Sequence, residues 1–297
     1  MHRKNIKDEK MRYEVAIWGI GVIYNRSVNV LRYLELLGQI KIVAITATEI
    51  PNVNMVDGYQ IVEKRELRNI NVDYLIIMND KHYKEIVQEA IICGIKQECI
   101  LPYRILNIPY IDFEAYIDLK RSNISIISDN CWGGIVYHSL GLECLSPFKN
   151  LFVEEDDYIR LLDNLTWYME QPLTFECFGM DKHVPTRYPI MTLGDVRIHC
   201  NHETDPIAAI EKWDRRRKKI NYDNLFVEMY SERADIIERF LALNNYKKKL
   251  CFVTFQSDHP NLFTLDTKQR ELWEVVNESS QYYLIDLLNG RKKTRYR

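Results

Sequence analysis

The stretch YEVAIWGIG, residues 13–21, is the starting point for the fold of the N-terminal half. Residues 13–18 form an apolar run with β-branched side chains, which predicts a buried strand. Gly19 and Gly21 follow directly, and a helical pattern then continues to Leu37. This order is typical of a phosphate-binding turn, in which the second glycine lets the backbone approach a pyrophosphate at the helix N-terminus.

Strands and helices alternate beyond this turn. Apolar runs predict further strands at residues 40–46, 59–62, 74–78 and 98–101, with a helix at 81–92. Such alternation implies a mainly parallel sheet with right-handed crossovers. We therefore predict an α/β fold whose residues 12–120 form a Rossmann-like domain of the nucleotide-binding type.

Two positions depart from the dinucleotide-binding pattern. Tyr24 stands where the third glycine or an alanine belongs, and it either loosens the helix–strand packing or blocks the site. The acidic residue expected after the second strand comes late, as Glu49. The alternative interpretation is therefore a Rossmann-like fold in which Gly19 and Gly21 only make a turn.

Residues 121–290 predict a second α/β domain. Its expected elements are strands at 124–128, 149–153, 196–200, 225–229, 250–255 and 282–287, and helices at 156–169, from Pro206, 231–243 and 265–277. The most distinctive loop, DNCWGG at 129–134, follows the first of these strands.

We expect this loop to bind a ligand through two side chains and two backbone amides. Asp129, Asn130 and the amides of Gly133 and Gly134 are candidates for contacts with hydroxyls or phosphate. Cys131 near a helix N-terminus would have a lowered thiol pKa, which makes it a candidate nucleophile. The alternative is a buried cysteine that holds a tight loop. The base is open among four histidines, at positions 138, 183, 199 and 202.

A second polar segment covers residues 191–221. His199, His202 and Asp195 are candidates for a general base or for sugar contacts. We predict no metal site, because a His-x-x-His spacing on an irregular loop lacks the surrounding partners that metal ligands need. Arg216 and Arg217 are candidates for a diphosphate clamp, and the alternative is a solvated basic helix end.

Both halves resemble known families. AIWGIG, IVAIT and DYLIIMND make the N-terminal half similar to the N-terminal domain of the sugar N-acetyltransferases of bacterial surface-glycan pathways. ISIISDNCWGG, MTLGDVRIHCNH and KWDRRRKKIN make residues 122–290 resemble a bacterial family of unknown function, often labelled exopolysaccharide biosynthesis protein. The first resemblance implies a nucleotide-sugar ligand, and the second implies a role near capsule or exopolysaccharide assembly.

Composition limits the classes of function. The 297 residues include 40 Lys+Arg and 42 Asp+Glu, and this near-neutral balance argues against a nucleic-acid binder. The longest apolar run is far shorter than a membrane span, and the N-terminus lacks a signal-peptide core. Seven cysteines without a Cys-x-x-Cys pair indicate reduced thiols. These features predict a cytoplasmic protein whose oligomeric state the sequence leaves open.

Three hypotheses remain. The first is a glycosyl- or acyl-transferase of exopolysaccharide or capsule biosynthesis that uses a nucleotide-activated sugar or, as the alternative, acyl-CoA, with Arg216 and Arg217 on the leaving diphosphate. The second is a non-catalytic nucleotide sensor or scaffold of a glycan-assembly complex. The third is a cysteine-dependent acyltransferase or hydrolase acting through Cys131. In each case the expected partner is a small nucleotide or sugar ligand.

Overall fold

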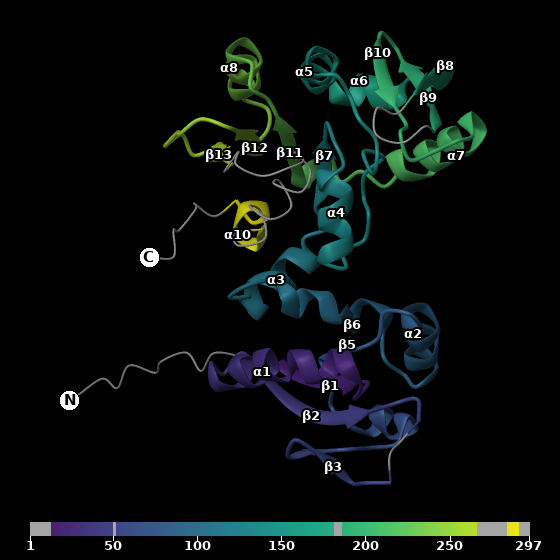
Figure 1. Ribbon diagram of the computed structural model, residues 1–297, viewed down its shortest axis with the longest axis vertical. Coiled ribbons are helices and arrows are strands. Elements are labelled where there is room, and N and C mark those ends of the chain that lie inside the picture. Colours follow the sequence, from purple (N-terminus) through teal and green to yellow (C-terminus); the bar gives the residue numbers. More distant parts are fainter. Residues whose placement is uncertain (1–12, 50–51, 181–185, 266–283, 291–297) are drawn as a thin grey trace, which may run out of the picture. The chain divides into compact units, whose positions relative to one another are not determined.

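The computed structural model describes residues 13–49, 52–180, 186–265 and 284–290, and it has a mixed α/β fold (Figure 1). The chain divides into two compact units, Met1–Tyr116 and Ile117–Arg297. Each unit contains a four-stranded parallel sheet. In the part of the chain that the structure describes, no helix is both long and apolar enough to cross a bilayer.

Unit 1 is built on a parallel sheet with the strand order β2-β1-β5-β6. Its strands are β1 (Tyr13–Trp18), β2 (Ile40–Thr46), β5 (Tyr74–Ile77) and β6 (Ile100–Pro102). The chain steps from β1 to β2 in one direction and then returns past β1 to β5. A small hairpin, β3 (Met55–Val56) and β4 (Tyr59–Gln60), lies in the connection between β2 and β5.

Helices α1 (Val22–Leu36) and α2 (Tyr83–Ile92) cover this sheet. The steps from β1 to β2 and from β5 to β6 run in opposite directions, so right-handed crossovers place the two helices on opposite faces. Ile86 and Ala90 of α2 pack with Ala16, Leu75 and Ile77 in one core cluster. This winding creates a reversal point between β1 and β5, where α/β sheets commonly bind ligands.

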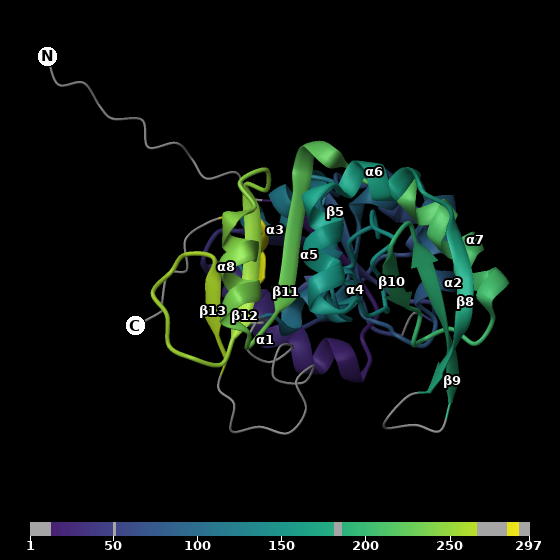
Figure 2. The same ribbon diagram turned by 90° about the horizontal axis from the view of Figure 1, so that it is seen from above.

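Unit 2 contains the parallel sheet β13-β12-β11-β7, whose strands β11, β12 and β13 lie side by side in Figure 2. The strands are β7 (Ser125–Ser128), β11 (Leu225–Tyr230), β12 (Lys248–Val253) and β13 (Leu262–Thr264). Helices α5 (Glu155–Asp163) and α8 (Ala234–Ala242) pack on the face that carries Ile127, Val227 and Met229. The opposite face carries Phe226 and Phe252, on which Trp132 of α4 (Trp132–Ser139) packs.

Between β7 and β11 the chain inserts an antiparallel sheet with the order β10-β9-β8. Its strands are β8 (Leu173–Met180), β9 (Arg187–Leu193) and β10 (Val196–His199). The other helices of the unit are α6 (Leu165–Glu170), α7 (Pro206–Arg217) and α10 (Leu284–Leu288), and α3 (Phe113–Arg121) spans the division between the units. The Asp205 side chain accepts the Ile207 N–H and caps α7, as the sequence predicts for this residue or its neighbour.

Several sequence-based predictions of elements are wrong. Residues 149–153 form no strand, because Asn150 has a φ of 59° and only Phe152 pairs, with His199. The helix expected at 156–169 is interrupted at Asn164, which lies outside the helical region at φ −144° and ψ 52°. The strand expected at 282–287 is helix α10 from residue 284 onward, because its buried leucines and isoleucine follow helical spacing.

Two of the observed strands were not predicted, and parts of two predicted elements lie outside the described residues. Strands β8 and β9 were not predicted, and β8 exposes most of its residues and lacks a clear alternating pattern. Residues 266–277 of one predicted helix, and residues 282 and 283 of the last predicted strand, lie outside the described residues.

Candidate functional site

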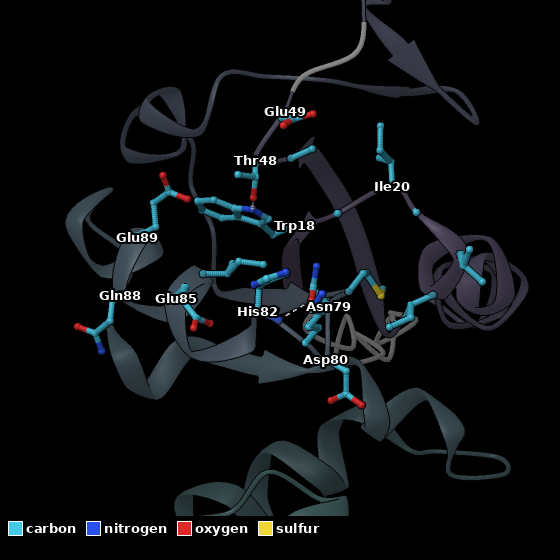
Figure 3. Close-up of a pocket in the computed structure, with 18 of the residues that line it drawn as sticks. Trp18, Ile20, Thr48, Glu49, Asn79, Asp80, His82, Glu85, Gln88 and Glu89 are labelled. Carbon is cyan, nitrogen blue, oxygen red and sulfur yellow. Dashed lines mark hydrogen bonds between the residues drawn. The ribbon is translucent and has the colours of Figure 1, made fainter.

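A pocket of about 1160 Å³ opens in unit 1 at the carboxyl ends of β1, β2 and β5 (Figure 3). It lies at the reversal point between β1 and β5, which is the common ligand position in open α/β sheets. Trp18 ends β1, Thr48 follows β2, and Met78 follows β5, and all three residues line the pocket. The order of the strands therefore sets the position of the pocket, and the glycine turn is only one part of its lining.

Gly19 and Gly21 both line the pocket, and they have different roles. Gly19 has a φ of 113°, and a Cβ there would lie 3.3 Å from the Met78 carbonyl oxygen, so only glycine suits this turn. Gly21 is the N-cap of α1 at φ −82°, and a Cβ there would meet no atom within 4 Å. The backbone at Gly21 is thus open to a ligand without being strained.

Two helix N-termini border the same pocket. Gly21 precedes α1, which has no acidic residue in its first turn and no side-chain cap. His82 is the N-cap of α2, and its backbone N–H donates to Asn79 Oδ1 at 2.9 Å. The partial positive charge of a helix N-terminus favours an anion such as phosphate, and no acidic side chain opposes this at α1, whereas Glu85 lies in the first turn of α2.

The rest of the lining supplies hydrogen-bonding groups. Thr48 Oγ1 accepts a 3.4 Å hydrogen bond from the Trp18 indole N–H, and Glu49 lies next to it in the pocket (Figure 3). Glu49 follows β2 in the chain and lines the pocket.

Acidic side chains at the pocket are partly neutralised by cations. Asp80 is ion-paired with Arg104, and Glu89 is ion-paired with Lys64. Glu85 lines the same wall from α2. These acids come from α2 and the loop before it, whereas the glycine turn belongs to the β1–α1 connection, so one pocket offers an anion-binding part and an acidic part.

Tyr24 does not line the pocket. Its side chain is only 1% exposed on the inner face of α1, and burial raises the pKa of its phenol. The expectation that Tyr24 blocks the site is therefore wrong in this structure. The tyrosine occupies space between helix and sheet that a glycine leaves empty.

In unit 2, a pair of buried carboxyl groups lies at the carboxyl ends of β7 and β11. Asp129 is 3% exposed and Glu228 is fully buried. Ser128 Oγ donates to Glu228 Oε2 at 2.5 Å, and Asn130 Nδ2 donates to Asp129 Oδ1 at 2.7 Å. Burial raises the pKa of Glu228 to about 8, and burial together with the Glu228 charge raises the pKa of Asp129 well above its usual range. The Asn130 amide thus donates to both carboxyl groups, to Asp129 and, at 3.4 Å, to Glu228 Oε1.

Cys131 lies beside this pair and contacts His202, with 3.3 Å between Sγ and Nε2. His202 was one of four candidate bases, and it lies 71 positions away in the chain. The expected lowering of the thiol pKa is wrong, because burial and the Glu228 charge raise the pKa of Cys131 to about 11. Of the four candidate bases, His202 contacts Cys131, and His183 lies outside the described residues.

Gly133 and Gly134 are buried at the start of α4, where they allow close packing. A Cβ on Gly133 would lie 3.1 Å from Ile126 Cγ2, and one on Gly134 would lie 2.4 Å from Asn150 Oδ1. The Gly133 N–H already donates to Ser128 Oγ at 3.3 Å. These glycines therefore bring α4 against β7 and the loop at Asn150, which is a packing role that the sequence analysis did not assign.

His199 and Asp195 lie at opposite ends of the four-residue β10 region, roughly 13 Å apart along the strand. His199 Nδ1 lies 3.3 Å from the Tyr188 hydroxyl, and burial lowers the pKa of His199. Asp195 accepts a 2.6 Å hydrogen bond from the Tyr168 hydroxyl, which lowers its pKa. The structure does not bring these two residues together as one catalytic group.

Arg216 and Arg217 lie at the C-terminal end of α7, about 18 Å along the helix from the Asp205 cap. The Arg217 guanidinium donates to the carbonyl oxygens of Met169 and Gln171, both at 2.8 Å. It also pairs with Asp214 at 2.9 Å. Arg217 therefore binds the C-terminal end of α6, and the structure gives it partners other than a diphosphate.

Two groups of residues at these sites were not predicted from the sequence. Glu228 was missed, although one charged residue inside the apolar stretch LFVEMY was a usable signal. Thr48, Asn79 and His82 were missed because each follows a strand without a recognisable motif. Among the described residues, no three or more His, Cys, Asp or Glu side chains are grouped so as to hold a metal ion.

Known families match both halves of the chain. A family described as "Domain of unknown function (DUF1919)" matches residues 102–285, and one described as "C2185-like, N-terminal" matches residues 11–101. An uncharacterized protein of Haemophilus influenzae is 34% identical over 137 residues. That similarity covers 45% of this chain and 63% of the relative, so the match spans less than two thirds of the relative's length.

Proposed function

The chain belongs to the family described as "Domain of unknown function (DUF1919)". We propose that it is a transferase of exopolysaccharide or capsule assembly. In this proposal unit 1 is a Rossmann-like domain that binds the nucleotide part of an activated sugar. The donated group then passes to a glycan precursor. The family description itself assigns no activity.

One observation carries the proposal: the pocket at the β1/β5 reversal point joins a glycine turn, two helix N-termini and a late acidic residue. The diphosphate of the donor binds at the N–H groups after Gly21, where no side chain intervenes. Thr48 and Glu49 face the ribose hydroxyls from the end of β2. The pocket volume suits a nucleotide-sized ligand.

Gly21→Val tests this assignment. A Cβ at this position meets no neighbouring atom, so valine closes the approach to the helix N-terminus without a clash, and equal unfolding midpoints of the two proteins establish that the fold is retained. We expect the wild-type protein to show a rise in melting temperature with one UDP-, GDP- or CDP-sugar, and Gly21→Val to lose that rise. Differential scanning fluorimetry and titration calorimetry measure both quantities.

Leu36→Ala is the matched control, because Leu36 is 84% exposed at the other end of α1 and does not line the pocket. It should bind the same donor as the wild-type protein. A thermal shift with NAD(P) alone would replace the transferase proposal with a redox function. Binding of a nucleotide-sugar without turnover in the presence of glycan acceptors would favour the sensor, and no response to any nucleotide would contradict the proposal.

A further inference from the structure

We propose that Cys131 and His202 form the nucleophile and base of a covalent acyl-transfer site in unit 2, with an acyl thioester on Cys131 as the intermediate. This acyl transfer goes beyond the proposed use of a nucleotide-sugar donor, and only the choice of a glycan hydroxyl as acceptor rests on the proposed function. The thiol chemistry itself stands on the geometry of unit 2, and none of its residues lines the nucleotide pocket.

The contact between thiol and imidazole is held by backbone hydrogen bonds on both sides. The Val153 N–H donates to the Asp129 carbonyl oxygen at 2.8 Å, so residues 152 and 153 lie beside the cysteine loop. Phe152 and His199 exchange two backbone hydrogen bonds, of 2.9 and 2.8 Å. A turn then closes between Cys200 and Glu203 and presents His202 to Cys131. The backbone on both sides therefore holds Cys131 and His202 close together.

The exposure of the two residues suits a substrate. His202 is exposed and Cys131 is half-buried, whereas Asp129 and Glu228 beneath the loop are closed off from solvent. A nucleophile needs a base within hydrogen-bonding reach, and the 3.3 Å separation of Sγ and Nε2 provides it. The carbonyl carbon of an activated acyl group is an electrophile that a thiol with a base in contact attacks.

The chemistry balances in two steps. The Cys131 thiol passes its proton to His202 Nε2 while sulfur bonds to the carbonyl carbon of an activated acyl donor, and the donor's leaving group departs with its bonding electrons and the proton. An acceptor hydroxyl then gives its proton to His202 and bonds to the same carbon. The carbon–sulfur bond breaks, and the ester product and the free thiol are formed.

Two titratable neighbours act on the thiol: Glu228 through its charge, and His202 by direct contact. Burial and the Glu228 charge raise the pKa of the Cys131 thiol, so the thiol needs a base in contact with it to react at neutral pH. The reactivity of Cys131 at pH 7 therefore depends on His202, and this dependence can be measured without a natural substrate.

The test is the rate of iodoacetamide labelling of each cysteine at pH 6 to 9, resolved by peptide mass spectrometry. We expect His202→Gln to slow the labelling of Cys131 at pH 7 by about tenfold or more. Cys177, an exposed cysteine on β8, should label equally in both proteins and serves as the internal control. Equal rates for Cys131 in the two proteins would overturn the proposal.

A second measurement follows the acyl group. p-Nitrophenyl acetate should acetylate Cys131 in the wild-type protein and release one nitrophenolate per thioester formed, and His202→Gln should lose this product. Acetylation of Cys177 without Cys131 would overturn the proposal. Equal unfolding midpoints of both proteins establish that the fold is retained, as expected for an exposed histidine. Because neither assay uses a nucleotide, their failure is distinct from a failure of nucleotide-sugar binding in unit 1.

Discussion

Glu228 makes the stability of the protein depend on pH. Its pKa is raised from an ordinary value of 4.5 to about 8, because a fully buried carboxylate loses its hydration. The folded chain therefore keeps a proton that the unfolded chain releases. The free energy of unfolding is greatest below about pH 4.5 with respect to this group, and it falls as the pH rises toward 8. Asp129 acts in the same direction.

Replacing Glu228 with glutamine should flatten this decline. The titration of one such group removes about 1.4 kcal/mol for each pH unit within the window, and glutamine carries no charge to titrate. Urea unfolding at pH 5 and pH 8 measures the difference. Glu238→Gln is the control, because Glu238 is exposed on α8 and should leave the wild-type pH dependence intact. A decline of equal slope in the Glu228→Gln protein would contradict the assignment.

Helix α6 depends on a side chain from α7. The last carbonyl groups of a helix have no partners within it, and the Arg217 guanidinium binds those of Met169 and Gln171. The side chain is 22% exposed, so water competes little for these bonds. Arg217 therefore connects the C-terminal end of α7 to the C-terminal end of α6, a structural role for a residue type that also binds phosphate.

Arg217→Ala should lower the free energy of unfolding by about 1.5–3 kcal/mol, the usual size for hydrogen bonds to a charged group. Nucleotide-sugar affinity should not change, since unit 1 contains the proposed pocket. Arg215→Ala is the matched control, because Arg215 is an exposed arginine in the same last turn. Unchanged stability together with weaker donor binding would restore the diphosphate clamp that the sequence suggested.

The two units have separate cores and separate candidate chemistry. One core cluster lies entirely in unit 1 and another entirely in unit 2. The carboxyl ends of the unit 1 strands offer a nucleotide pocket, and those of the unit 2 strands carry the buried acids and the Cys131–His202 pair. A nucleotide that binds as proposed should therefore protect residues of unit 1 and leave those of unit 2 unchanged.

Hydrogen exchange with mass spectrometry can map this footprint. A saturating nucleotide-sugar should slow exchange at residues 19–25 and 79–83, because these amides form the turn and the two helix N-termini of the pocket. A nicotinamide dinucleotide that gives no thermal shift is the control, and it should leave the exchange at these residues unchanged. Slowed exchange confined to residues 117–265 would contradict the placement of the donor in unit 1.

Local pattern was enough to predict most of the parallel strands. β1, β2, β5, β7, β11 and β12 are apolar runs flanked by glycine or polar residues, and a buried strand needs little more information than that. The glycine turn after β1 was equally readable, because the positive φ at Gly19 is a local requirement. The prediction of a strand at 149–153 was wrong because Asn150 has a positive φ. Asparagine adopts both positive and negative φ values, so its type does not show which one the fold requires.

The partnerships at the sites required the folded chain. Cys131 meets His202 across 71 positions, and Ser128 meets Glu228 across 100, because the insertion between β7 and β11 returns the chain to the same sheet edge. No residue pattern encodes that return. The residue types and the α/β elements are local properties of the sequence. The burial of Glu228, the raised pKa of Cys131 and the engagement of Arg217 arise from packing between distant segments, which sets the desolvation and the hydrogen-bond partners of each group.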